Sequence, residues 1–206
     1  MSTENAPGKG RWARRYGQLL VGLAFFGFSL AVLIRAELGL PPWDVLHQGV
    51  AERTPFTFGT VVIIASLFVM LLWIPLRQRP GPGTVANALL VGLFVDLGLW
   101  ILPEVSHLGV RVAMLVGGIL LCGVSTGLYV GAGLGPGPRD GLMTGLAARG
   151  VPVGLARAGI ELSALAVGWV LGGTVGLGTV AFALLVGPVV HWSVPRLRID
   201  RGAREV

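Results

Sequence analysis

Residues Gly83–Asp96 read GTVANALLVGLFVD, and residues Gly178–His191 read GTVAFALLVGPVVH. The two stretches are identical at ten of fourteen positions, with a constant offset of 95 residues. A second pair, Leu38–Arg53 (LGLPPWDVLHQGVAER) and Leu134–Arg149 (LGPGPRDGLMTGLAAR), is identical at eight of sixteen positions with an offset of 96. The chain is therefore a fused duplication.

The composition identifies an integral membrane protein. The 206 residues are 53% hydrophobic and 13% charged, whereas a soluble domain carries about 25% charged residues. Crossing a hydrocarbon core of about 30 Å takes roughly 20 apolar residues in a helix. We expect six such spans, near residues 15–36, 57–76, 84–102, 110–132, 152–172 and 176–195. The first is expected to be a retained span rather than a cleaved signal peptide.

Each copy holds three spans, an odd number, so the second copy is expected upside down relative to the first. The predicted fold class is an all-α membrane protein with six transmembrane helices, arranged as two inverted-topology three-helix repeats, each with a short half-helix after its first span. We place an N-terminal tail at 1–14, repeat A at 15–107, repeat B at 108–195 and a basic tail at 196–206. Inverted repeats of this kind occur mainly in transporters and channels.

The positive charges predict the orientation. With the N-terminus inside, twelve Lys and Arg residues lie in cytoplasmic segments, and only Arg35, Arg53 and Arg111 face outside. The positive-inside rule then places both termini in the cytoplasm. The net charge of +6 follows from this topology and from attraction to anionic lipid, so no nucleic-acid partner is needed. Tryptophans near the predicted span ends are expected as interfacial anchors: Trp12, Trp73, Trp100, Trp169 and Trp192.

Two short segments are too polar to cross. Residues 41–56 (PPWDVLHQGVAERTPF) and 135–152 (GPGPRDGLMTGLAARGVP) each have a Gly and Pro cluster, an Asp two residues after a Pro, and a short helical pattern. Each is predicted to be a half-helix entered by a tight turn. Broken helices at membrane depth survive where they are buried in protein or line a water-filled cavity, so the pair points to a central site.

The two aspartates, Asp44 and Asp140, have two interpretations. A carboxylate at a helix start accepts backbone N–H bonds, which is the favoured explanation. Alternatively, both line a cavity and hold a cation or a proton. The copies differ nearby, since Trp43 and His47 in the first correspond to Arg139 and Met143 in the second.

Further ionisable residues lie inside apolar spans. Asp96 and His191 occupy equivalent positions of the duplication. Arg157 and Glu161 are four residues apart, hence on one helix face, and can neutralise each other. They either form a structural ion pair, or Glu161 binds a proton or cation and Arg157 an anionic substrate group.

Enzyme chemistry has weak support. Gly123–Gly127 reads GVSTG, and Ser125 with His191 resembles the serine and histidine arrangement of rhomboid proteases. A G-x-S-x-G nucleophile needs a strand-to-helix turn, which is absent here, so helix packing is favoured. No metal, ATP or dinucleotide motif is present. Cys122 is alone, so the chain has no internal disulfide. We expect no catalytic residue, cofactor or metal.

The runs LGLPPWDVLHQGVAERTPFTFGT (38–60) and RPGPGTVANALLVGLFVDLGL (79–99) resemble the YczE/YyaS/YitT group of bacterial multi-pass membrane proteins, and most closely its YczE branch. The resemblance extends from the first span to the last. It implies an integral membrane protein or permease and brings no catalytic residues. The matching positions are Gly39, Pro42, Trp43, Asp44, Gly49, Thr57, Gly59, Gly83, Thr84 and Asp96.

The leading functional hypothesis is a small permease for a solute or ion. Asp44 and Asp140 would position or coordinate it, Glu161 and Asp96 would carry a coupling charge, and Arg157 would attract a negative group. The alternative is an accessory or assembly protein that recruits partners through cytoplasmic arginines such as Arg196 and Arg198. An intramembrane serine hydrolase is a minor alternative. Besides the lipid bilayer, the expected partner is a small solute or ion, and a homodimer is compatible with the small size.

Overall fold

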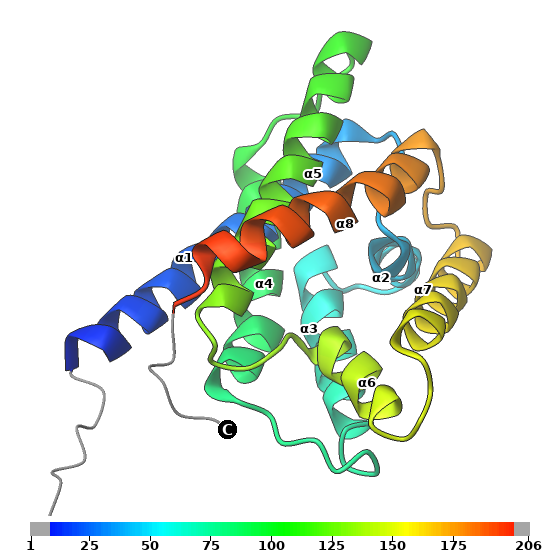
Figure 1. Ribbon diagram of the computed structural model, residues 1–206. Helices are drawn as coiled ribbons and strands as arrows, with labels where there is room; N and C mark the ends of the chain where they lie inside the picture. Colours follow the sequence, from blue (N-terminus) through cyan, green and yellow to red (C-terminus); the bar gives the residue numbers. More distant parts are fainter. Residues whose placement is uncertain (1–8, 200–206) are drawn as a thin grey trace, which may run out of the picture.

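The computed structural model describes residues 9–199, and within them the chain forms eight α-helices and no strand (Figure 1). This confirms the all-α class. Most of the two predicted tails, 1–14 and 196–206, lies outside the described residues. The helices are α1 (Lys9–Ala36), α2 (Pro42–Ala51), α3 (Phe58–Leu71), α4 (Pro82–Ile101), α5 (Leu108–Gly131), α6 (Pro138–Ala147), α7 (Val153–Val170) and α8 (Leu177–Leu197).

Five helices are long and apolar enough to cross a membrane, namely α1, α4, α5, α7 and α8. The remaining predicted span, 57–76, is a shorter apolar helix, because α3 ends at Leu71 after 14 residues. At 1.5 Å per residue it spans about 21 Å. The backbone then forms turns up to Arg77, which has a φ of 50°. Pro75 explains the early end, since proline lacks an N–H and disfavours helical geometry in the residue before it.

The half-helices form where the sequence predicts them. α2 and α6 have ten residues each and begin with a proline, Pro42 or Pro138. Proline suits the first helical position because its missing N–H would have no partner there. The residue before each helix, Pro41 or Gly137, has extended backbone, which turns the chain sharply into the helix.

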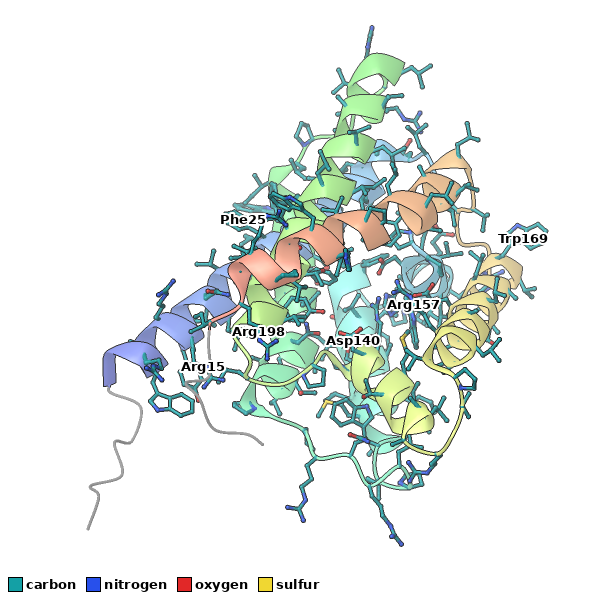
Figure 2. The ribbon with its side chains drawn as sticks, in the orientation of Figure 1. Arg15, Phe25, Asp140, Arg157, Trp169 and Arg198 are labelled. Carbon is teal, nitrogen blue, oxygen red and sulfur yellow. The ribbon has the colours of Figure 1, made fainter. Side chains whose placement is uncertain are left out.

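The first helices of the two halves, α1 and α5, run antiparallel against each other. Arg15 near the start of α1 donates to the carbonyls of Ala132 and Gly133 after α5. Arg111 near the start of α5 donates in the same way to Ala36 and Glu37 at the end of α1. The two arginines, 96 residues apart, thus satisfy carbonyls that a helix end leaves free. Figure 2 shows Arg15 near the start of α1.

Each half also packs its first helix against its last. A Cβ on Gly27 of α1 would lie 2.6 Å from the Cβ of Phe94 in α4, and one on Gly123 of α5 would lie 2.4 Å from Val189 in α8. These close contacts need residues without side chains. Most of the buried apolar core lies along α1, α4 and α5.

The two halves differ in how the middle helix packs. In the first half, Gly59 of α3 faces Gly92 of α4 so closely that a Cβ on either would clash with the other's carbonyl oxygen. Their equivalents, Gly154 of α7 and Gly187 of α8, have nothing within 4 Å of an added Cβ. α7 packs instead on α2, where Gly168 contacts the backbone of Leu46. Figure 1 shows α7 and α8 diverging from their connecting loop.

Four of the predicted tryptophan anchors are exposed on the helix surface: Trp12, Trp100, Trp169 and Trp192. Figure 2 shows Trp169 pointing away from the molecule. The prediction is wrong for Trp73, which is 2% exposed. Its indole N–H donates to the carbonyl of Pro138 at 3.0 Å, and its ring covers Gly141 of α6. The turn after α3 carries Trp73 inward, so it anchors α6 rather than the lipid interface.

Candidate functional site

A cavity of about 350 Å³ lies inside the helix assembly. All eight helices contribute to its wall, and its size falls at the lower end of the range for small-molecule sites, about 300–1,000 Å³. The first half contributes mainly apolar groups, such as Phe26, Leu30 and Val62. The polar and charged groups come mostly from the half-helix starts and from the second half. Seven of the nine predicted site residues line the cavity: Trp43, Asp44, Arg139, Asp140, Arg157, Glu161 and His191.

The N-termini of both half-helices open onto this cavity. A helix N-terminus carries a partial positive charge and unpaired N–H groups, which favour anionic ligand groups. The two starts also contact each other, because the guanidinium of Arg139 in α6 lies 5.0 Å from the ring centre of Trp43 in α2. Its Nη2 is 3.9 Å from Oδ1 of Asp44. Two segments 96 residues apart therefore form one site.

Asp44 is buried, with 1% of its surface exposed. Its Oδ1 lies 3.0 Å from Nδ1 of His47, one turn further along α2. His47 does not line the cavity but lies behind Asp44, edge-on to the ring of Phe58. Burial lowers the pKa of His47, so the ring is neutral. The second oxygen, Oδ2, has no hydrogen-bond partner among the described residues, and neither has the buried Nε1 of Trp43.

Asp140 has a different environment from Asp44. The hydroxyl of Tyr129 in α5 donates to its Oδ2 at 3.2 Å, and the backbone N–H of Gly137 also donates to the carboxylate. Removal from water raises the pKa of Asp140, while these bonds and Arg139 oppose the rise. The capping interpretation therefore describes Asp140. For Asp44 the structure gives no backbone donor within residues 9–199, and its partners are His47 and Arg139.

Arg157 and Glu161 form the predicted ion pair on α7, with Nε 2.9 Å from Oε1. Both line the cavity, and the Arg157 side chain is 54% exposed. Figure 2 shows Arg157 and Asp140 on the inner side of α7 and α6. Since only Nε of Arg157 donates to Glu161, its two terminal nitrogens have donors left for a ligand.

Asp96 lies outside the cavity. It accepts hydrogen bonds from the Thr57 hydroxyl at 2.6 Å and from the Gly59 N–H at 2.8 Å, and so caps the start of α3. Asp96 therefore has this structural role and not its predicted role in the site, because α3 packs on α4. His191, its equivalent, has no helix start opposite because α7 does not approach α8, and it therefore lines the cavity.

Tyr129 and Asn87 are among the polar lining residues that were not predicted from the sequence. Their equivalents in the other copy are the apolar Leu33 and Phe182. A polar residue in one copy where the other has an apolar one is a signal that could have found both.

Ser125 is fully buried and donates to the Cys122 carbonyl at 2.9 Å. Ser29, its equivalent, donates to Phe26 in the same way. Both bonds lie within their own helices, as packing requires. Ser125 is absent from the cavity wall to which His191 belongs. Within residues 9–199, no group of three or more His, Cys, Asp or Glu side chains is arranged to hold a metal ion.

The family of the chain follows from comparisons with known proteins. Residues 13–195 match the model of a family described as a family of unknown function, DUF6198. The chain belongs to the DUF6198 family. An uncharacterized protein of Haemophilus influenzae is 40% identical over 88% of this chain and 85% of its own length. The uncharacterized membrane protein YczE of Bacillus subtilis is 36% identical over 90% and 86%.

A third relative, the uncharacterized protein YyaS of Bacillus subtilis, is 22% identical over 85% of this chain and 90% of its own length. The suspected relationship with YczE and YyaS is thus confirmed. No solved structure matches this DUF6198 chain. Together with its five long apolar helices, the relationship identifies an integral, multi-pass membrane protein.

Proposed function

We propose that this protein is a small permease that binds a polar solute or ion in the central cavity and carries it across the membrane. The observation that carries the proposal is the meeting of two half-helix N-termini at a cavity that holds charged side chains. A charged group at membrane depth costs about 2.5–3.5 kcal/mol on insertion scales, so such groups mark ligand or proton pathways. Packing alone would be served better by apolar residues.

The proposal takes residues 15–107 and 108–195 as inverted repeats. It is supported by the antiparallel α1 and α5 and by contacts that recur at equivalent positions, such as those of Arg15 and Arg111. With twelve of fifteen loop cations inside, both termini are cytoplasmic in this proposal. The start of α2 then enters from outside and that of α6 from inside.

The unequal packing of the two halves suggests how access alternates. α3 is closed onto α4 through Gly59 and Gly92, whereas α7 stands away from α8. In an inverted repeat, the opposite state exchanges the two arrangements. We propose that α7 closes onto α8 through Gly154 and Gly187 while α3 separates from α4, which moves the opening from one side to the other.

Thermal unfolding in detergent with a panel of metabolites and ions tests the proposal. A ligand at 100 times its dissociation constant stabilises the native state by about 2.7 kcal/mol. We expect one compound to raise the Tm of the wild type but not of Glu161→Gln or Asp44→Asn. Asp96→Asn is the matched control. Because Asp96 lies outside the cavity, this substitution should leave binding intact.

The same compound should accumulate in proteoliposomes containing the wild type and not in those containing Glu161→Gln. A compound that binds without crossing would contradict transport. The accessory-protein alternative would be favoured by a different result in cells. In that case Asp44→Asn and Glu161→Gln keep wild-type function, and substitution of Arg196 and Arg198 abolishes it.

A further inference from the structure

The cavity presents charges of both signs at close range. Asp44, Asp140 and Glu161 supply carboxyl oxygens, while Arg139 and Arg157 supply guanidinium N–H groups. Only one bonded pair, Arg157 with Glu161, neutralises charge within hydrogen-bond distance. Arg139 and Asp44 are 3.9 Å apart, which is too long for a hydrogen bond. Both therefore keep bonding capacity that the protein itself does not use.

One oxygen of Asp44 lacks a donor. Its Oδ1 is engaged by His47, but its Oδ2 is buried without a partner among residues 9–199. A buried carboxylate oxygen that has given up water without gaining a donor is costly, so unsatisfied groups of this kind call for a specific explanation. A charged N–H donor from a ligand, such as an ammonium group, supplies the missing bond and balances the charge.

One residue earlier, Trp43 lacks an acceptor in the described part of the chain. Its Nε1 is buried without a partner there, and an indole N–H can only donate. The guanidinium of Arg139 lies over the Trp43 ring and its side chain is 25% exposed. A ligand reaches Asp44 and Trp43 by displacing this guanidinium, which then remains beside the bound molecule. Carboxylate oxygens match both the Trp43 N–H and the Arg139 fork.

From these unused groups we infer that the cavity binds a small zwitterion of the amino-acid type, with its ammonium on Asp44 and its carboxylate on Trp43 and Arg139. The inference rests on the proposed function and narrows it to a substrate class. A simple cation would face two guanidinium groups, and a simple anion would face the unneutralised Asp44. The apolar wall of Phe26, Leu30 and Val62 accommodates a side chain.

The probes are the twenty L-amino acids, measured by thermal shift and then by calorimetry on the full-length protein in detergent. At least one should raise the Tm. For the best binder, its methyl ester, which lacks the negative charge, and its N-acetyl derivative, which lacks the positive charge, should each bind at least about tenfold more weakly.

Trp43→Phe removes the unpartnered N–H and keeps an aromatic ring, although a smaller one, beside Arg139. It should weaken amino-acid binding about fivefold or more. Asp44→Asn and Arg139→Gln should each weaken it at least about tenfold. The control, Asp96→Asn, should lower the Tm and leave affinity unchanged.

The outcomes separate this inference from the permease proposal. If a singly charged derivative or an uncharged metabolite binds as tightly as the parent zwitterion, the zwitterion inference is overturned, while the permease proposal stands. If no amino acid shifts the Tm, the inference also fails, and the wider metabolite panel decides the permease proposal. Unaltered affinity in Trp43→Phe together with Arg139→Gln would overturn the assigned carboxylate site.

Discussion

Three acidic side chains show how surroundings set the role of a residue. Asp96 accepts a backbone N–H bond at the start of α3 and caps that helix. Asp140 accepts a hydrogen bond from the hydroxyl of Tyr129. Asp44 contacts the ring of His47, and its second oxygen has no partner among the described residues. The sequence suggested the same two roles for Asp44 and Asp140, and a coupling charge for Asp96. What distinguishes them is the number of donors that neighbouring helices bring to each carboxylate.

The pH dependence of the protein's stability should report the titration of His47. Burial lowers its pKa, so as the pH falls below about 6.5 the unfolded chain gains a proton that the folded chain refuses, and stability is lost. Asp140 acts in the opposite sense. Its raised pKa makes the folded state keep a proton that the unfolded state releases as the pH rises above about 4.

We therefore expect His47→Gln to flatten the decline of Tm between about pH 7 and pH 5 relative to the wild type. Asp140→Asn should not flatten it. Thermal unfolding of the three proteins in one buffer series provides the measurement. Parallel Tm curves for the wild type and His47→Gln would show that His47 does not titrate between the folded and unfolded states.

At the scale of helices, the glycine pairs provide a matched comparison. A Cβ on Gly59 would lie 2.0 Å from the Gly92 carbonyl oxygen, whereas one on Gly154 meets nothing within 4 Å. Gly59→Ala and Gly92→Ala should therefore destabilise the protein by about 1–3 kcal/mol. Gly154→Ala and Gly187→Ala should be neutral or stabilise it by up to about 1 kcal/mol. Denaturation of the four variants measures the difference, and equal losses in both pairs would contradict the unequal packing.

The proposed closure of α7 onto α8 makes a second prediction about the same glycines. Gly154→Leu should leave the Tm and ligand affinity near the wild type, because the present structure has space at this position. It should lower transport at least about tenfold, since closure brings two backbones together as GxxxG-type contacts do. Proteoliposome uptake measures this. Wild-type transport in Gly154→Leu would show that the two helices never close.

At the scale of the whole molecule, Arg15 and Arg111 join the two halves at opposite ends of the α1–α5 pair. Each donates to two carbonyls of the other half, and lysine cannot form this planar fork. Arg15→Lys and Arg111→Lys should each destabilise the protein by about 1–2 kcal/mol. Because the sites are far apart, the double variant should show the sum.

Arg196→Lys is the control for this pair, since among the described residues Arg196 donates only to Trp192 of its own helix. Its unfolding free energy should remain within about 0.5 kcal/mol of the wild type. A large loss in Arg15→Lys with none in Arg111→Lys would show that the two halves are not joined reciprocally.

The sequence by itself determined the membrane class, the duplication and the positions of α2 and α6, and seven of the nine site residues predicted from it line the cavity. These follow from local physics: apolar length, proline at helix starts and identity between the copies. The short α3 was also readable in principle from Pro75, whose effect on the backbone does not depend on distant contacts.

Only the tertiary structure decided which equivalent residues keep equivalent roles. Asp96 caps a helix and His191 lines the cavity because α3 packs on α4 while α7 packs on α2. Trp73 is buried because the turn after α3 carries it onto α6, where its indole N–H donates to the carbonyl of Pro138. Packing between helices distant in the sequence leaves no local pattern, so two nearly identical copies acquire different surroundings, and the unpaired groups of Trp43 and Asp44 become visible only once all eight helices are in place.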